Sequence, residues 1–309
     1  MSGDLHCHTR LSDGSMGIED LIVLAQKKGI ETIAITDHDC LAGTVRGKII
    51  GDRSGVKVIP GVELSAVDHE TGRVAHLLCY LPEFPDRLEG LCRVNQVARK
   101  RAAQYMMIKA GAKFPITNEL VIKCASGSTN IYKQHIMHAL MECGLACETY
   151  GEEYNRLFHP DSGECIYVKP PFAAVEEVLQ SIHAAGGIAV LAHPVLYDSF
   201  DLLERLIPLG LNGVEVWHPT ASREDVDRLI AIAKKHKLLM TGGSDFHGMY
   251  GHKGTSLGSF LTPKTQLNEL LAYKSRQKRL AKKAAEAAAQ AAAAEAQAAA
   301  AEAQAAAEK

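Results

Sequence analysis

Two histidines separated by one residue are the first side chains of the chain that could do chemistry. His6 and His8 lie in the run Asp-Leu-His-Cys-His, residues 4–8, which has the pattern of a short strand. Side chains two residues apart on a strand point to the same face, so the two imidazoles could share one metal ion. Cys7 should point to the opposite face, which argues against a structural zinc site, because such sites usually recruit cysteine.

Further histidines and carboxylates follow at the ends of other apolar segments. The candidate metal ligands are His6, His8, Asp13, His38, Glu63, His76, His193, Asp245 and His247. A mixed set of histidines and carboxylates suits Zn²⁺, Mn²⁺ or Fe²⁺, whereas Ca²⁺ prefers a shell of oxygen ligands. Several ions bridged by a carboxylate would favour hydrolysis by a metal-bound hydroxide. Histidines that stand alone are more often structural and are not counted as ligands.

A strand–helix–strand unit would position the first of these residues. Ile18, Leu21, Ile22 and Ala25 form one helical stripe within residues 18–29. Residues 31–36 then form a strand apolar enough to be buried on both faces. Because ionisable residues follow both strands, the unit fits a parallel barrel or sheet with its site at the carboxyl ends of the strands.

The strand–helix pattern continues along the chain but is interrupted once. We expect a helix over 42–52, a strand over 56–60 whose continuation through 61–65 is either its end or a new strand, and a hairpin returning through 73–80. Helical patterns dominate from 86 to 167, which predicts an insertion that caps the strand ends. The alternation resumes with helices over 172–185, 202–209 and 223–235 and strands over 188–192, 213–217 and 238–241. The part built of alternating strands and helices would therefore comprise residues 1–85 and 168–273.

The last segment, residues 274–309, differs in composition from the rest. A basic cluster leads into a seven-residue repeat that is almost pure alanine. Alanine is the best helix former, and the repeat lacks Leu or Ile at its seam, so the segment is predicted to be a single solvated helix rather than a coiled coil. It contains no catalytic residues.

Composition sets broad limits on the function. A chain of 309 residues with 47% hydrophobic content can bury a large core, in one barrel or two domains. The net charge of −2 argues against a broad nucleic-acid-binding surface but allows a local basic groove. The eight cysteines are scattered, no secretory signal precedes Asp4, and no apolar run approaches the ~18 residues of a membrane span. We therefore expect a cytoplasmic protein with reduced cysteines and no membrane partner.

The separated motifs resemble, in order, those of the polymerase and histidinol phosphatase (PHP) family. They are Asp4-Leu-His-Cys-His-Thr9, Ser12-Asp-Gly14, Thr36-Asp-His-Asp39, Gly61-Val-Glu63, His76, Ala192-His-Pro194 and Ser244-Asp-Phe-His247. The resemblance covers about residues 4–82 and 170–262, and implies an α/β fold, a distorted (β/α)7 barrel that holds three metal ions. It implies a first ion held by His6, His8, Glu63 and Asp245, a second by Glu63, His76 and His193, and a third by Asp13, His38 and His247. No ligand position is missing.

The helical insertion resembles one branch of this family, the small-molecule phosphoesterases. Relatives in that branch hydrolyse nucleoside 3′,5′-bisphosphates, oligonucleotide 5′ ends or a cyclic ribose phosphate, and the bisphosphatases typically have an Arg-x-His pair on an insertion helix. This chain has Lys133-Gln134-His135. Lysine keeps the charge but loses the bidentate fork of arginine, which favours a cyclic phosphate of the 5-phosphoribosyl 1,2-cyclic phosphate type. Without the resemblance, Lys133 and His135 would be surface residues of a helix.

The expected mechanism is phosphoester hydrolysis with two to three divalent ions, of which Mn²⁺ is favoured over Fe²⁺ and Zn²⁺. Glu63 would bridge the ions, Asp245 would orient the attacking hydroxide, and His218 would protonate the leaving group. His218 could equally pack with Trp217 at the barrel rim. The residues expected to hold a second phosphate or the sugar are Lys133, His135 and Lys253.

Two alternatives stay open. One is a nucleoside 3′,5′-bisphosphate phosphatase or a 5′-to-3′ exoribonuclease that acts on short RNA 5′ ends, with a groove supplied by Lys109, Lys113, Lys123 and Lys133. The other is a non-catalytic scaffold assembled through the alanine-rich tail, with an oligomeric state that the sequence leaves open. The complete ligand set speaks against the scaffold.

Overall fold

A seven-stranded sheet forms the centre of the fold and nearly closes into a barrel. The computed structural model describes residues 2–251 and 254–307, with side chains through residue 291. The strands lie in the sheet in chain order: β1 (Gly3–Cys7), β2 (Thr32–Ile35), β3 (Lys57–Val67), β4 (Val74–Tyr80), β5 (Ile188–Leu191), β6 (Gly213–Trp217) and β7 (Leu239–Gly242). The end of β1 also bonds to the segment after β7, because His8 N donates to Phe246 O at 2.8 Å and Phe246 N donates to His6 O at 3.2 Å. The first and last strands thus meet, as a distorted barrel requires.

Strand β3 changes partners midway. Its first half pairs in parallel with β2, up to Ile35 opposite Pro60, and its second half pairs antiparallel with β4, starting from Gly61 opposite Tyr80. Pro60 has no N–H to donate, but its carbonyl accepts from Leu81 N at 2.9 Å. Residues 61–65 therefore belong to one continuous strand, which settles the alternative that the sequence left open.

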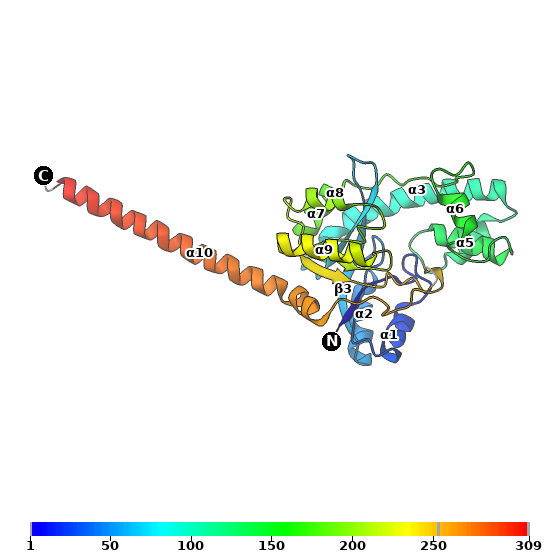
Figure 1. The fold of residues 1–309 in the computed structure, drawn as a ribbon, viewed down its shortest axis with the longest axis horizontal. Helices are drawn as coiled ribbons and strands as arrows, with labels where there is room; N and C mark the ends of the chain where they lie inside the picture. The colour runs from blue at the N-terminus through cyan, green and yellow to red at the C-terminus, as the bar shows by residue number, and fades with distance from the viewer. Residues whose placement is uncertain (1, 252–253, 308–309) are drawn as a thin grey trace. The chain divides into compact units, whose positions relative to one another are not determined.

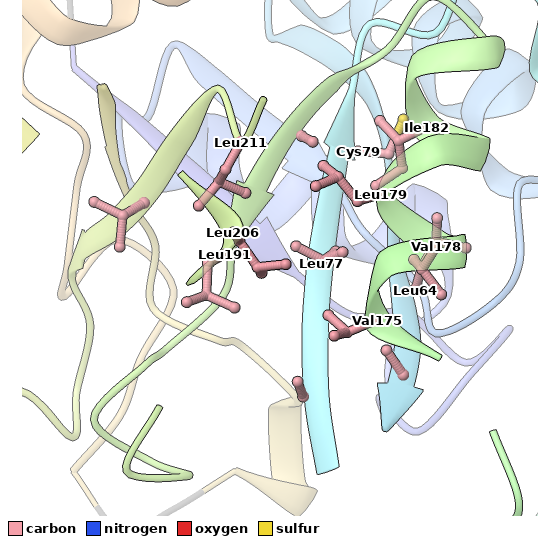
Figure 2. Close-up of a cluster of buried hydrophobic side chains, with 14 of the residues drawn as sticks. Leu64, Leu77, Cys79, Val175, Val178, Leu179, Ile182, Leu191, Leu206 and Leu211 are labelled. Atoms are coloured by element: carbon pink, nitrogen blue, oxygen red, sulfur yellow. The ribbon is translucent and has the colours of Figure 1, made fainter. Parts of the chain in front are cut away.

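Helices pack on the sheet: α1 (Ile18–Lys27), α2 (Gly43–Ser54), α7 (Val175–Ala184), α8 (Phe200–Leu206) and α9 (Arg223–His236). Figure 2 shows Val178 and Ile182 of α7 beside Leu64 of β3 and Cys79 of β4, and all four are buried in the largest hydrophobic cluster. Helix α7 begins at Val175 rather than at residue 172, because Ala174, its N-cap residue, is extended. A helix was correctly predicted here, but its predicted start at residue 172 was wrong.

The insertion contains the helices α3 (Glu89–Lys113), α4 (Asn118–Cys124), α5 (Lys133–Glu142) and α6 (Glu152–Phe158). Figure 1 shows α3, α5 and α6 gathered beside the barrel strands. These helices bury a hydrophobic cluster of their own that includes Met106, Val121, Ile136 and Leu157. The insertion therefore has its own core, while Cys92 near the start of α3 packs in the hydrophobic cluster of the barrel.

Helix α3 fastens the insertion to the barrel through buried polar contacts. The Asn95 amide donates to Asp39 Oδ1 at 2.8 Å and to Ser65 O at 2.6 Å. Arg99 donates to Ser65 Oγ at 2.6 Å and to Asp39 Oδ2 at 3.2 Å. Asp39 follows the predicted ligand His38, and Ser65 lies two residues after Glu63, so α3 contacts residues next to the site.

The chain ends in one long helix, α10 (Lys264–Ala307), drawn in Figure 1. The second compact unit of the structure, Leu267–Lys309, consists largely of this helix, and the first unit is Met1–Gln266. A helix was predicted here, but it begins before residue 274. Within the described ranges, no helix combines the length and hydrophobicity needed to cross a bilayer.

Candidate metal centre

The nine ligands predicted from the sequence lie around one centre at the ends of the strands. His6 belongs to β1, Glu63 to β3 and His76 to β4, while the others follow β1, β2, β5 or β7 in the chain: His8, Asp13, His38, His193, Asp245 and His247. All are buried except Asp245, whose side chain is 21% exposed. The structure therefore brings together residues from position 6 to position 247.

Glu63 lies at the middle of the cluster, between two sets of histidines. Its Oε1 is 2.9 Å from His76 Nδ1 and 2.8 Å from His193 Nε2. Its Oε2 lies 3.2–3.3 Å from a ring nitrogen of each of three further histidines, His6, His8 and His38. A carboxylate whose two oxygens face different ligand sets has the arrangement needed to bridge two ions.

The other two carboxylates each join further histidines. Asp245 Oδ1 is 3.2 Å from His8 Nε2 and 3.4 Å from His6 Nε2. Asp13 Oδ1 is 3.3 Å from His247 Nε2 and 3.4 Å from His8 Nδ1. In four overlapping groups of such residues, the potential ligand atoms lie within 4.8 Å of one another.

Unpaired polar atoms show that these residues suit cations. Five buried atoms of the predicted ligands have no hydrogen-bond partner among the described residues: His6 Nε2, His8 Nε2, Asp13 Oδ1, His38 Nδ1 and His193 Nδ1. Each such atom costs about 1–3 kcal/mol if it stays unpaired, and a cation would pair with them together. One ring nitrogen of His247 already has a hydrogen-bond partner, because His247 Nδ1 lies 2.7 Å from the carbonyl oxygen of Asp245. This leaves its Nε2 to face the centre.

The histidines keep the carboxylates ionised. Burial alone would raise the pKa of Glu63, but His38, His76 and His6 hold it well below its usual range. Burial also opposes ionisation of Asp13 and Asp245, and the nearby His247 is the main group that lowers the pKa of both, well below the ordinary value. Ionised carboxylates are the form that binds metal.

Backbone strain occurs at three strand ends of the site. Asp39, His193 and Asp245 have φ values of 50°, 24° and 49°, in the left-handed region that residues other than glycine rarely adopt. Each costs of order 1 kcal/mol and persists because the surrounding contacts hold it. His193 and Asp245 thereby turn toward the centre immediately after β5 and β7.

Glu215 is a functional residue that the sequence reasoning missed. It is fully buried on β6, with Oε1 3.0 Å and Oε2 3.2 Å from His6 Nδ1, and Oε2 accepts from His193 N at 2.9 Å. It thus orients one predicted ligand and the backbone of another. The sequence did contain a sign of this role. Glu215 stands between Val214 and Val216 in a buried strand, where a carboxylate needs a partner.

Gln134 was also overlooked. Its amide nitrogen donates to Asp13 Oδ2 at 3.0 Å and to Tyr150 Oη at 3.0 Å. Lys133 and His135, the outer residues of the Lys-Gln-His motif, were the predicted site residues. The middle residue, Gln134, is the one that contacts a predicted ligand. Helix α5 therefore reaches the centre through Gln134.

His218 lies at the edge of the cluster, just after β6. Its Nε2 is 3.5 Å from Asp245 Oδ2, and the Thr220 backbone N–H donates to its Nδ1 at 3.2 Å. Nδ1 also lies 2.8 Å from Thr220 Oγ1, so Thr220 holds this nitrogen and Nε2 is left to face Asp245.

The predicted substrate-binding residues differ in their surroundings. The Lys133 ammonium lies 5.1 Å from the ring centroid of Tyr167, 5.3 Å from that of Tyr154 and 5.9 Å from that of Phe158. Burial would lower its pKa, but Tyr154 and Tyr167 raise it, so the side chain stays charged. Within the described part of the chain, the groups around the Lys133 ammonium are aromatic rings rather than carboxylates.

His135 is not a surface residue, so that alternative interpretation was wrong for it. It is 2% exposed, its Nδ1 accepts from Tyr132 N at 3.1 Å to cap α5, and burial lowers its pKa to about 4. Of the other predicted basic residues, Lys109 and Lys123 are exposed and Lys113 pairs with Glu164 at 3.5 Å. Lys253 lies outside the described residues.

Comparison with known proteins gives consistent matches. Residues 4–158 match the family model of the PHP domain. The chain is 35% identical, over 81% of its length and 96% of the relative, to phosphoribosyl 1,2-cyclic phosphate 1,2-diphosphodiesterase of Eggerthella lenta. It is 33% identical, over 79% of its length and 84% of the relative, to the 5′-3′ exoribonuclease Rnm of Escherichia coli. A crystal structure from Bifidobacterium adolescentis, of a protein assigned by inference as a metal-dependent phosphoesterase, matches with a TM-score of 0.78 and 31% identity, over 87% of this chain and 95% of that one.

Proposed function

Because the chain belongs to the PHP domain family, we propose that it is a metal-dependent phosphoesterase that hydrolyses a sugar cyclic phosphate of the 5-phosphoribosyl 1,2-cyclic phosphate type. The observation that supports this most is the position of Glu63, whose two oxygens face separate sets of histidines. The relative from Eggerthella lenta supports the choice of substrate, and it is matched over nearly its whole length.

The ligand sets that we propose are those implied by the family motifs. We assign one ion to His6, His8, Glu63 and Asp245, a second to Glu63, His76 and His193, and a third to Asp13, His38 and His247. When bound, two to three ions, with Mn²⁺ favoured over Fe²⁺ and Zn²⁺, would neutralise phosphate oxygens and lower the pKa of a coordinated water.

Asp245 and His218 are suited to the proton transfers. Asp245 is the most exposed of the nine residues, so its carboxylate can accept a hydrogen bond from an attacking water and orient it toward phosphorus. A doubly protonated His218 could give its Nε2 proton to the leaving alkoxide and return to the neutral ring, while Thr220 Oγ1 would accept a hydrogen bond from its Nδ1 proton. Hydrolysis of the first ester bond would leave a monoester. Its phosphorus would still lie at the same site, so a second hydrolysis could follow.

Lys133 is our candidate for the second phosphate. Its charge is held among aromatic rings rather than by a carboxylate, so it is available to an anion, and it offers a point charge rather than a two-pronged contact. His135 can assist only through Nε2, because its Nδ1 caps α5. Lys253 completes the proposed set.

The test compares substrates with the full chain reconstituted with Mn²⁺. We expect kcat/KM for a 5-phosphorylated sugar 1,2-cyclic phosphate to exceed that for a nucleoside 3′,5′-bisphosphate or a short RNA, with phosphorus NMR detecting the intermediate monoester. A clear preference for the bisphosphate or for RNA would overturn the substrate assignment and leave the metal chemistry intact.

Metal content tests the centre itself. Elemental analysis should find two to three ions per chain, and Glu63→Gln should lower both metal content and turnover by orders of magnitude, because the bridge is lost. One ion or none in the wild type, or near-normal turnover in the variant, would contradict the assignment.

The second candidate is 5′-to-3′ exoribonuclease activity, which the 33% identical Escherichia coli relative favours. Exposed Lys109 and Lys123 on the insertion could contact RNA phosphates, and the same substrate comparison decides between the two. The complete ligand set disfavours the non-catalytic scaffold. The proposed location is the cytoplasm, where the eight cysteines would stay as the free thiols found in the structure.

A further inference from the structure

One segment of α10 has an unusual concentration of positive charge. Residues 274–283, the basic segment, contain six basic side chains and no acidic one: Lys274, Arg276, Lys278, Arg279, Lys282 and Lys283. Lys274 is half-buried and the other five are exposed. The nearest carboxylates along the chain are Glu269 and Glu286. None of these residues belongs to the proposed catalytic site.

The six basic side chains share one side of the helix. At about 100° per residue, they span roughly 200° of its circumference. The opposite side of the basic segment and the next turn presents Gln277, Leu280, Ala281 and Ala284. The helix therefore has a basic face and an uncharged face.

This arrangement opposes helix formation locally. Lys274 and Lys278, Lys278 and Lys282, and Arg279 and Lys283 are like-charged pairs four residues apart. A solvated helix face usually alternates its signs, as Lys282 does with Glu286 at 3.8 Å. An external polyanion would relieve the repulsion among these cations.

We propose that the basic segment binds the phosphate backbone of nucleic acid, an interaction separate from the hydrolytic site. Ten helical residues extend about 15 Å, and duplex DNA has one phosphate charge per ~1.7 Å of its axis, so six cations meet a comparable density of anions. An anionic membrane is a poorer fit, because a helix that lies on a bilayer needs large apolar side chains opposite its charges. Leu280 is the only large apolar residue on that side.

The experiment measures binding of the full-length, Mn²⁺-loaded protein to a short fluorescein-labelled duplex DNA by anisotropy at several salt concentrations. Six phosphate contacts predict that affinity falls about 10³-fold between 50 and 200 mM salt. The triple variant Arg276→Gln, Arg279→Gln, Lys283→Gln should bind more weakly, and its affinity should fall only about 40-fold over the same range.

A matched control removes the same charge elsewhere. Lys234→Gln, Lys235→Gln, Lys237→Gln changes three exposed lysines at the end of α9 and should leave DNA binding unchanged. Both triple variants should hydrolyse the small substrate like the wild type, so a failure of the proposed hydrolytic function is seen separately. Equal losses of binding in both variants, or no salt-dependent binding by the wild type, would overturn the proposal. Stronger binding to anionic vesicles than to DNA would overturn it too and assign the segment to membranes.

Discussion

A histidine that could bind metal is oriented by the group that contacts its other ring nitrogen. His6 shows this, because Glu215 occupies its Nδ1 and thereby directs Nε2 toward Glu63. A ring fixed in one tautomer presents its lone pair to a cation without rearrangement. We therefore infer that Glu215 is a positioning residue, which acts through the proposed metal ligand His6.

Glu215→Gln tests this role. Glutamine keeps the size of the side chain but removes the charge that fixes the His6 tautomer, so we expect metal affinity to fall about 10- to 100-fold. Calorimetric titration of the metal-free protein measures this, with urea unfolding as a check on the fold. The control is Glu204→Gln, an exposed change on α8. Unchanged metal affinity in Glu215→Gln would rule out the positioning role.

Lys133→Ala tests the proposed second-phosphate contact. Removing the ammonium should raise KM for a substrate with a second phosphate about tenfold and hardly affect a simple chromogenic phosphomonoester, which never reaches that contact. Lys133→Arg should restore binding and shift preference toward 3′,5′-bisphosphates, because arginine adds a bidentate fork. Equal losses on both substrates would mean that Lys133 supports the aromatic cluster instead.

The residues that the sequence predicted are those whose position along a strand implies their direction. His6 and His8 share a face because strand side chains alternate, and the ordered motifs located the remaining ligands. Gln134 and Glu215 could not be placed this way, because their roles depend on contacts across 121 and 209 positions of the chain. Such contacts become visible only in three dimensions.

At the scale of elements, periodicity predicted which segments are helices better than where they begin. Helix α7 is an example. It was predicted to begin at residue 172, but Ala174 still has an extended backbone and the helix begins at Val175. The local sequence pattern also could not predict that β3 changes partners. Residues 57–67 have the alternation of a strand whichever neighbour they pair with. The helical insertion was predicted from its helical patterns, but its anchoring through Asn95 was not.

The turn between β3 and β4 should make stability depend on pH. Asp68 accepts from Thr71 Oγ1 at 2.7 Å and from Arg205 of α8 at 2.5 Å. Burial would raise the pKa of Asp68, but Thr71 and Arg205 lower it below its ordinary 3.8. A lowered folded-state pKa stabilises the fold above the unfolded-state value, and this stability is lost as pH falls through the folded-state value.

Asp68→Asn should therefore be less stable than the wild type by about 1 kcal/mol at pH 7, with the difference shrinking as pH falls below about 4. Urea unfolding at pH 7 and pH 3 measures both differences. Asp52→Asn, an exposed change on α2, serves as the control and should show no gap at either pH. A gap that stays constant with pH would contradict the ionic origin of the effect.

At the scale of the whole molecule, the nine predicted ligands fall within the first compact unit, Met1–Gln266. The sequence indicated this separation, because the alanine-rich repeat lacks residues suited to catalysis. A chain truncated after Tyr273 should keep kcat/KM for the small substrate within about twofold and lose binding to duplex DNA. Steady-state kinetics and anisotropy on the same preparation measure both. A large drop in kcat/KM would show that the tail contributes to the hydrolytic site.

The order of the strands has a consequence for protein synthesis. Glu63 and His76 lie on adjacent strands joined by one hairpin, so with His38 they can come together once about the first 80 residues have left the ribosome. His193 follows much later, and Asp245 and His247 emerge last. The nascent chain should therefore gain metal affinity in stages, and a ribosome stalled before β7 would release a fragment able to hold an ion but unable to cut phosphate esters. Full activity should therefore require synthesis of β7 and of the segment that contains Asp245 and His247.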